Sequence, residues 1–595
     1  MLENKKMGRI VGVNGNLLTV EFDSSVTQNE VAYAIVGDSR LKCEVIRVRG
    51  SRADLQIFES SAGLKVGDDV EFTDALLSVK LGPGLLTQVY DGLQNPLEKL
   101  AEAAGFFLKR GLYMDPLDYE STWKFTPTAK VGDKVVASDR IGWVPEGIFQ
   151  HSIMIPFAFK DTWEITEIAP AGTYTLTDTM AKVKNSKGEE RVVTMVQEWP
   201  VKIPISCYKE KLMPTEPMIT QMRTIDTFFP VAKGGTFCTP GPFGAGKTVL
   251  QHSISRNAEA DVVIIAACGE RAGEVVEILR EFPHLEDPRT GKPLIDRSII
   301  ICNTSSMPVA AREASLYSGL TLAEYYRDMG YNVAIMADST SRWAEALREL
   351  SGRLEEMPAE EGFPAYLASR LSQFYERAGM VQNLNGTEGS VSIIGAVSPQ
   401  GGDFSEPVTQ NTKRFVRCFW GLDKNLAYAR HFPAIQWLTS YSEYLTDLSS
   451  WYSEHVDKNF VNYRNQLVTI LNQESSLMEI VKLIGSDVLP DDQKLVLEIA
   501  KVIRLGFLQQ NAFHKEDTCV PLKKQFKMME IILYLYKKSR ALVAMGMPVS
   551  VLKEEKIFEK IIAIKYDVPN DRLDMFDDYK KQIDDFYNSV IERNA

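Results

Sequence analysis

The sequence predicts a multidomain protein with an N-terminal β-barrel, an inserted β-rich module, a central α/β domain and a C-terminal α-helical domain. Three patterns support this prediction. Short strand patterns separated by turn signals fill two stretches before about residue 200, strands alternate with helices from about residue 201, and apolar residues recur at helical spacing after about residue 450. The predicted boundaries are 1–76, 77–114 (a connector), 115–200, 201–449 and 450–595.

The first β-rich stretch opens with an Asn14-Gly15 turn signal, after which Val20 and Phe22 alternate with polar neighbours. Closely spaced strands, frequent turns and the absence of a helical pattern predict a small barrel, and a compact sandwich fits the same pattern. Glycine and proline punctuate the connector. The inserted module has turn signals between its strands but no recognisable chemistry.

The alternating stretch predicts a parallel sheet whose ligand lies at the carboxyl ends of the strands, because crossover helices cover both faces of such a sheet. Five apolar runs are the expected strands: 235–239, 261–268, 298–303, 332–338 and 391–397. Each of them ends at a residue that could face a bound ligand.

Two apolar faces support the C-terminal helical domain. They are formed by Phe526, Met529, Leu533 and Tyr536, and by Leu477, Ile480 and Ile484. We expect both faces to belong to the core.

Composition narrows the class of protein. With 45% hydrophobic and 25% charged residues, the 595-residue chain is an ordinary globular sequence long enough for several cores. No apolar run reaches membrane-spanning length and no signal-peptide pattern opens the chain, so we expect a cytosolic protein. Seven single cysteines give no zinc or disulfide pattern. A net charge of −12 argues against nucleic acid as the partner.

The most informative stretch is a glycine-rich loop that follows the first expected strand. It fits G-x-x-x-x-G-K-[ST] with Gly241, Gly246, Lys247 and Thr248 in the defining positions. The other residues that we assign to the loop are Pro242, Phe243, Gly244, Ala245 and Val249. An ordinary glycine turn between strand and helix is the alternative.

Such a loop binds phosphate, because its backbone N–H groups and the positive end of the following helix point at the same place. In this interpretation Lys247 meets the β- and γ-phosphates and Thr248 binds a magnesium ion. The sequence therefore predicts a nucleotide site.

Three charged residues are candidates for the chemistry of phosphoryl transfer to water. Asp338 ends an apolar strand, from where a carboxylate can hold magnesium, although it could also cap a helix beside Ser339. Glu270 follows another strand and could act as a base toward the attacking water. Arg271 could steady the terminal phosphate, or it could form a structural salt bridge with Glu270.

Over nearly its whole length the chain resembles the catalytic A subunit of the vacuolar and archaeal (V/A) type rotary ATPases, in its prokaryotic form. The matching segments include T-I-D-T-F-F-P-V-A-K-G-G at 224–235, P-G-P-F-G-A-G-K-T at 240–248, N-T-S-S-M-P-V-A-A-R-E-A-S at 303–315 and I-M-A-D-S-T-S-R-W-A-E-A-L-R-E-L at 335–350. C-G-E-R at 268–271 and L-Q-Q-N-A-F at 508–513 also match.

The resemblance implies a P-loop (RecA-like) nucleotide-binding domain that binds ATP or ADP with Mg²⁺ and couples ATP turnover to H⁺ or Na⁺ transport. It supports Lys247, Glu270 and Arg271 as catalytic residues, and Thr248 and Asp338 as metal ligands. Phe432 and Phe513 resemble the family's adenine-contacting aromatics; from composition alone both would be core residues. The inserted module resembles the bulge of A subunits.

The partners implied by the resemblance are B subunits in an alternating hexamer, central stalk subunits, a peripheral stalk and a membrane ion-translocating sector. A B-subunit arginine completes the site in trans. The chain would therefore lie peripherally on the cytoplasmic face of a membrane, without inserting into it and without binding nucleic acid.

The chain departs from the family at two positions. Ala272-Gly273-Glu274 stands where many relatives have Gly-Asn-Glu, and Ala245 stands where eukaryotic relatives have a cysteine. The alternatives are an F type β subunit or a type III secretion ATPase, a hexameric RNA translocase, and a non-catalytic nucleotide-binding subunit.

Overall fold

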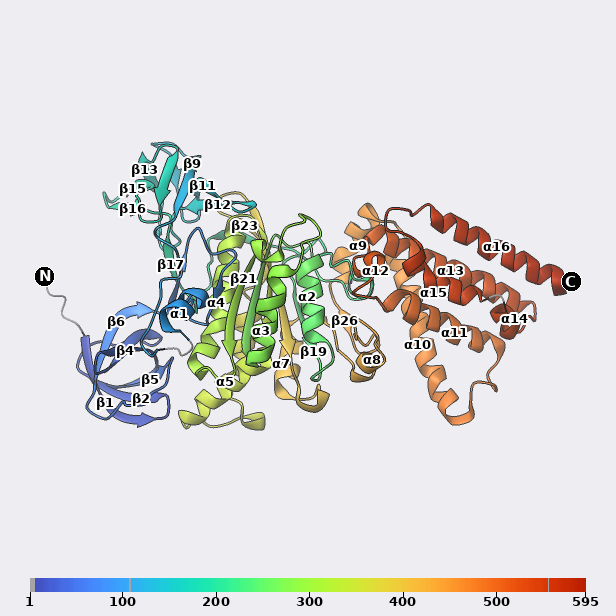
Figure 1. Ribbon diagram of the computed structural model, residues 1–595, viewed down its shortest axis with the longest axis horizontal. Helices are drawn as coiled ribbons and strands as arrows, with labels where there is room; N and C mark the ends of the chain where they lie inside the picture. The colour runs from blue at the N-terminus through green and yellow to red at the C-terminus, as the bar shows by residue number, and fades with distance from the viewer. Residues whose placement is uncertain (1–5, 106–108, 555, 595) are drawn as a thin grey trace. The chain divides into compact units, whose positions relative to one another are not determined.

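A computed structural model describes residues 6–105, 109–554 and 556–594 (Figure 1). Residues 106–108 of the expected connector lie outside this description. The chain forms two compact units. The first comprises 1–213, 234–236 and 260–415, and the second comprises 214–233, 237–259 and 416–595.

The first unit begins with a closed six-stranded barrel, which confirms the barrel and not the sandwich. Its strands are β1 (Lys6–Asn14), β2 (Leu17–Phe22), β3 (Glu30–Val36), β4 (Ser39–Arg49), β5 (Arg52–Ile57) and β6 (Asp69–Leu76), in the order β1-β2-β5-β4-β3-β6. Val20 and Phe22 point into the barrel core, as their alternation predicts. Gly15 has a φ of 59° in the β1–β2 turn, where glycine is favoured.

The inserted β-rich module forms two four-stranded sheets. One has the order β10 (Lys134–Val135), β13 (Trp163–Ile168), β15 (Ala181–Asn185) and β16 (Glu190–Val193). The other has the order β12 (Phe149–Met154), β11 (Arg140–Glu146), β9 (Thr122–Pro127) and β14 (Gly172–Thr175). β7 (Ser78–Leu81) precedes these strands in the sequence and β17 (Gln197–Pro200) follows them. The two strands pair antiparallel with each other and so bring together the two ends of the chain that enters and leaves the module.

The first unit also contains a largely parallel sheet, which is the predicted arrangement. Its parallel strands run in the order β24 (Glu388–Val397), β22 (Asn332–Asp338), β20 (Val262–Glu270), β21 (Ser298–Thr304) and β8 (Val89–Tyr90). Antiparallel β23 (Gly379–Asn383) and β18 (Tyr208–Leu212) extend it. β8 comes from the expected connector, which also contains α1 (Leu97–Ala104).

Helices cover this sheet, as Figure 1 illustrates. The helices of this region are α3 (Ala272–Glu281), α4 (Val309–Asp328), α5 (Thr340–Arg353), α6 (Leu367–Tyr375) and α7 (Pro407–Phe415). α4 is buried along nearly all of its length. The strands of the sheet are therefore apolar on both faces, which is why the sequence identifies them so well.

The second unit contains the glycine-rich loop between β19 (Thr236–Pro240) and α2 (Lys247–Asn257). Phe237 and Cys238 pair in parallel with β25 (Cys418–Phe419), which pairs with β26 (Tyr441–Ser442). A short π-helical turn, η1 (Thr224–Phe228), and helix α8 (Lys424–Tyr428) belong to the same unit.

The rest of the second unit is helical, as predicted, and Figure 1 shows these helices packed together. They are α9 (Leu445–His455), α10 (Phe460–Ile484), α11 (Asp491–Val502), the π-helical turn η6 (Ile503–Leu508), α12 (Lys515–Thr518), α13 (Leu522–Ala544), α14 (Val549–Lys553), α15 (Ile557–Asp567) and α16 (Met575–Asn594). Among the described residues no helix has the length and apolarity needed to cross a membrane.

The two predicted apolar faces of this region differ in their burial. On α13, Phe526, Met529 and Leu533 are buried, and Tyr536 is half-buried. On α10 the core prediction is wrong, because Ile480 is 42% exposed and Ile484 is 55% exposed.

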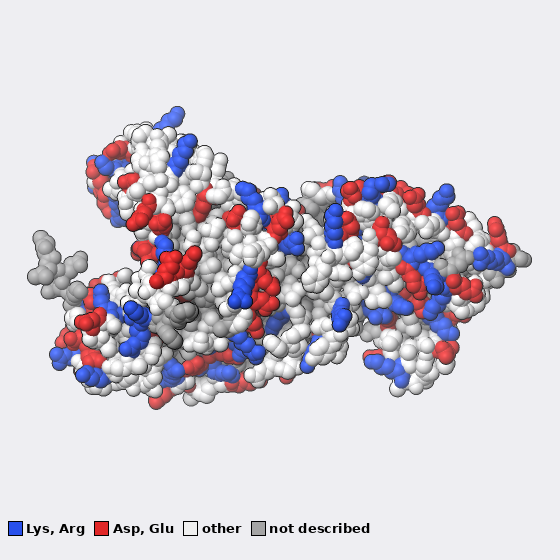
Figure 2. All heavy atoms as spheres, viewed as in Figure 1, with Lys and Arg blue, Asp and Glu red and all other residues white. Residues whose placement is uncertain are grey.

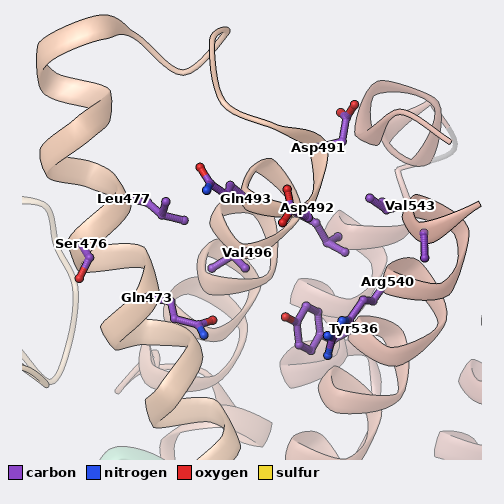
Figure 3. Close-up of a pocket in the computed structure, with 12 residues that line it drawn as sticks. Gln473, Ser476, Leu477, Asp491, Asp492, Gln493, Val496, Tyr536, Arg540 and Val543 are labelled. Carbon is purple, nitrogen blue, oxygen red and sulfur yellow. The ribbon is translucent and has the colours of Figure 1, made fainter. Parts of the chain in front are cut away.

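Leu477 of α10 is half-buried and lines a cavity of about 760 Å³ between α10, α11 and α13 (Figure 3). Beyond it, the last turns of α10 are mostly exposed. Helical periodicity identifies an apolar face but does not say whether another element covers it.

Candidate functional site

The glycine-rich loop has the backbone conformation that its glycines permit. Gly244 and Gly246 have φ values of 78° and 83°, in the left-handed region that side chains disfavour. Gly241 is required for a different reason, because a Cβ there would lie 2.7 Å from the Leu422 Cβ. Ala245 is buried, and its N–H donates to the Pro242 carbonyl at 3.2 Å. The loop is therefore a tightly constrained turn.

The helix that follows the loop begins at Lys247. The first N–H groups of a helix have no partner within it, so the N-terminus of α2 directs donors and a partial positive charge toward the loop. The Lys247 Nζ donates to the Gly241 carbonyl at 3.1 Å, which holds the ammonium group over the loop. Thr248 lies half-buried in the first turn of α2. These groups together are suited to bind a phosphate chain.

The two aromatic candidates lie in the same unit as this loop, on segments that are hydrogen-bonded to each other. The Gln510 N–H donates to the Phe432 carbonyl at 2.7 Å, and the Gln509 Nε2 donates to the Arg430 carbonyl at 3.2 Å. Phe432 is half-buried, whereas Phe513 is 98% exposed. The interpretation of Phe513 as a core residue is therefore wrong.

Asp338 and Glu270 lie at one edge of the sheet of the first unit. Asp338 ends β22 and is 7% exposed; it is in register with Ala267 of the neighbouring β20. Glu270 ends β20 after an irregularity at Gly269, whose φ is 71°. Because both strands are parallel, their two carboxylates belong to the same carboxyl-end edge.

The helix-cap alternative for Asp338 is wrong. Ser339 is the N-cap of α5, and its hydroxyl accepts a hydrogen bond from the Arg342 N–H at 3.3 Å. Arg271 is exposed at the N-cap position of α3, and Glu274 is half-buried in the first turn of that helix.

Two further arginines lie at this edge that the sequence did not single out. A Cβ on Gly269 would lie 2.7 Å from the Arg342 Cβ and 3.1 Å from the Arg312 Cδ. The hydrogen bond to Glu345 raises the pKa of Arg342, and the charges of Glu270 and Glu274 raise it further. Arg342 lies in the first turn of α5, the helix that follows the strand ending at Asp338, and this place in the sequence is the signal that could have identified it.

The candidates thus fall into two groups. The glycine-rich loop with Lys247 and Thr248 lies in the second unit together with Phe432 and Phe513, whereas Glu270, Arg271 and Asp338 lie in the first. Within the described part of the chain, no group of three or more His, Cys, Asp or Glu side chains could hold a metal ion. Magnesium does not need such a group, since it is commonly held by one or two protein oxygens, water and phosphate.

Charges of both signs are interspersed on the face shown in Figure 2, where Lys and Arg lie among Asp and Glu. A nucleic-acid channel is instead expected to gather basic side chains into a stripe. The visible face therefore gives no support to an RNA translocase.

Family models match four successive segments of the chain. They are the beta-barrel domain of the ATP synthase alpha/beta family (10–74), the barrel-sandwich domain of the ATP synthase alpha/beta proteins (114–202), the nucleotide-binding domain of the same family (221–442) and the C-terminal domain of V and A type ATP synthase (449–550).

Individual relatives are similar over most of their length. A V-type ATP synthase alpha chain of Halothermothrix orenii is 50% identical over 589 residues, covering 99% of both chains. The A subunit of the A-type ATP synthase of Methanopyrus kandleri is 51% identical over 595 residues, covering 99% of this chain and 100% of the relative. A V-type ATP synthase alpha chain of Treponema denticola is 54% identical over 529 residues, covering 89% of this chain and 88% of the relative.

Proposed function

Since the chain belongs to the family of V-type and A-type ATP synthase A subunits, we propose that its glycine-rich loop and its carboxylate edge act on one bound ATP. As a member of this family it is an ATPase subunit that hydrolyses or synthesises ATP and couples the reaction to ion transport. The observation that carries the residue assignment is the loop itself, in which left-handed glycines, a helix N-terminus and Lys247 converge.

The loop binds the phosphates in this proposal. Backbone N–H groups of the loop donate to phosphate oxygens, and Lys247 exchanges the Gly241 carbonyl for the β- and γ-phosphates. Thr248 and Asp338 would hold the magnesium ion. When bound, that ion would offset the negative charge of the phosphates.

The carboxylate edge supplies the chemistry. Glu270, whose side chain is half-buried, accepts a proton from the attacking water or orients it. Arg271 follows Glu270 in the sequence, and Arg342 packs against the neighbouring Gly269. Guanidinium groups stabilise the charge that spreads over the transferred phosphoryl group.

The chain works as part of a multisubunit, membrane-associated ATP synthase complex. We infer an alternating hexamer with B subunits, each providing an arginine in trans, around central stalk subunits on the cytoplasmic face of the membrane. A peripheral stalk and a membrane ion-translocating sector complete it. The match to a C-terminal domain named for V and A type enzymes favours this family over the F type and type III secretion ATPases.

A direct test is the affinity of the purified chain for Mg-ATP. Replacing Lys247 with Ala removes a charged hydrogen-bond donor, a loss typically of about 1.5–3 kcal/mol, so Kd should rise about 10-fold to 100-fold. Titration calorimetry measures the change. Lys482→Ala, which removes an exposed lysine of α10 in the same unit, is the control and should leave Kd unchanged. Equal affinity in the two variants would exclude Lys247 from the site.

The proposed base contacts are tested separately. Stacking of a base on an aromatic side chain contributes about 1–3 kcal/mol, so Phe432→Ala with Phe513→Ala should weaken ATP binding by ~10-fold or more and change kcat less. Affinity is measured in the assembled complex by equilibrium binding, with Tyr587→Ala on α16 as an aromatic control. Unchanged affinity in the double variant would show that neither ring contacts the base.

A further inference from the structure

A buried ion pair lies behind the segment that carries Phe513. The side chains of Arg223 and Asp517 are both 0% exposed, and the Arg223 Nη1 donates to the Asp517 Oδ1. The same arginine donates from Nη2 to the Gln509 carbonyl at 2.7 Å and from Nε to the Phe507 carbonyl at 2.5 Å. Its backbone N–H donates to the Gln510 Oε1 at 2.7 Å. Arg223 therefore holds one segment at three of its residues.

A second cation reaches the same segment from α15. The buried Lys565 Nζ donates to the Leu505 carbonyl at 2.7 Å and to the Gln509 carbonyl at 3.2 Å. The Asp517 Oδ2 accepts the Asn511 N–H at 2.7 Å. The carbonyl of Gln509 is thus held by two positive charges, and the N–H of Asn511 is held by the carboxylate.

These contacts extend to the other aromatic side chain. The Gln510 N–H donates to the Phe432 carbonyl and the Gln509 Nε2 to the Arg430 carbonyl, so two hydrogen bonds join the two segments. The backbone of Phe513 is fixed as well, because its N–H donates to the Asn511 Oδ1 at 3.0 Å. Its ring is nevertheless 98% exposed. A rigid backbone that presents an exposed aromatic ring is the arrangement that stacking on a ligand requires.

Stability alone does not account for these charges. Burying an ion pair costs so much desolvation that well-packed apolar residues usually stabilise a fold as well or better. The partners just described direct their bonds at carbonyls and N–H groups between residues 505 and 511, at the end of η6 and in the loop that follows it. This points to a role in fixing the shape of that loop.

We propose that Arg223, Asp517 and Lys565 are positioning residues for the nucleotide base, and that they hold segments 430–432 and 509–513 as a rigid wall. The inference rests on the proposed function, since it assumes that the aromatic rings on this wall contact the base. The ordered wall lowers the entropy lost when ATP binds, so loosening it should raise KM and leave kcat nearly unchanged.

The chain offers a matched control for Lys565. Lys524 is also buried, and burial lowers the pKa of both lysines to about 8. The Lys524 Nζ donates to the Val568 carbonyl at 2.6 Å and to the Asn570 Oδ1 at 3.0 Å. No bond of its Nζ to segment 509–513 occurs among the described residues. The two lysines are alike in their burial and in their lowered pKa, but only the Lys565 Nζ donates a hydrogen bond to the Gln509 carbonyl.

The test compares Lys565→Met with Lys524→Met in the assembled complex. Loss of a charged hydrogen bond to the wall should raise KM for ATP by ~10-fold in Lys565→Met, with kcat within ~2-fold. Lys524→Met should leave KM within ~2-fold of the value for the unmodified complex. Lys565→Arg, which keeps a charged donor, should have a KM close to that value as well. Thermal unfolding of each variant checks the fold; Lys565→Gln, which keeps a donor, replaces the Met variant if that fails to assemble.

A double-mutant cycle separates positioning from a general loss of structure. In a complex that carries both Phe432→Ala and Phe513→Ala, Lys565→Met should raise KM by no more than ~2-fold, because both rings on the wall are gone. Equal KM changes in the two lysine variants, or multiplicative effects of Lys565→Met and the double aromatic substitution, would overturn the inference alone. An unchanged KM in the double aromatic variant itself would overturn the base contact, and this inference with it.

Discussion

The chain assembled with its B-subunit partner is expected to hydrolyse ATP ~10³-fold or more faster than the chain alone. In the proposed function the site has phosphate ligands, a base and arginines of its own, and a further arginine that would offset the transition-state charge is supplied by the neighbouring subunit. An arginine supplied in trans contributes only when the interface has formed. Steady-state phosphate release from the purified chain, before and after titration with the B partner, measures the effect.

The matched control for this prediction is a B partner in which the interface arginine is replaced by Ala. That complex should assemble and bind ATP but remain as slow as the isolated chain. Full activity in a chain verified to be monomeric would rule out a site completed in trans.

Replacement of Glu270 with Gln is expected to slow hydrolysis by ~10²-fold to ~10⁴-fold, the usual effect of removing a general base. Gln has the size of Glu and keeps a hydrogen-bond acceptor, but it has no basic carboxylate. The backbone around position 270 should persist, because the Glu270 carbonyl accepts the Ser305 N–H at 2.9 Å independently of the side chain. The steady-state rate of the assembled complex gives the magnitude.

Glu274 provides the comparison for Glu270, since it is a half-buried carboxylate that follows soon after it, in the first turn of α3. Glu274→Gln should retain a rate within ~10-fold of the unmodified complex, a smaller loss than a missing base causes. If Glu274→Gln is the slower of the two variants, the base has been assigned to the wrong carboxylate.

The strands were predictable because burial on both faces leaves an unmistakable apolar run. The run at 332–338 coincides with β22, and Asp338 stands at its last residue as expected. The loop was predictable for a related reason, since left-handed glycines at a helix N-terminus leave a fixed pattern in the sequence.

The errors came from contacts that a linear pattern does not contain. Periodicity placed Ile480 and Ile484 on one helical face. In the part of the chain that the structure describes, no other element covers these two side chains, and the periodic pattern does not contain that information. Composition favoured a core position for Phe513, which a hydrogen-bonded loop instead presents to solvent. Arg223 and Asp517 are 294 residues apart in the sequence, so no local sequence pattern predicts that they form an ion pair.

Single-turnover hydrolysis tests the central claim most directly, namely that the loop binds ATP and the carboxylate edge cleaves it. Complexes carrying Glu270→Gln or Lys247→Ala are mixed with less than one equivalent of radiolabelled Mg-ATP, and bound ATP and ADP are quantified over time. We predict that the Glu270→Gln complex retains ATP uncleaved, whereas the Lys247→Ala complex fails to retain it. Cleavage by Glu270→Gln at the rate of the unmodified complex would contradict the account.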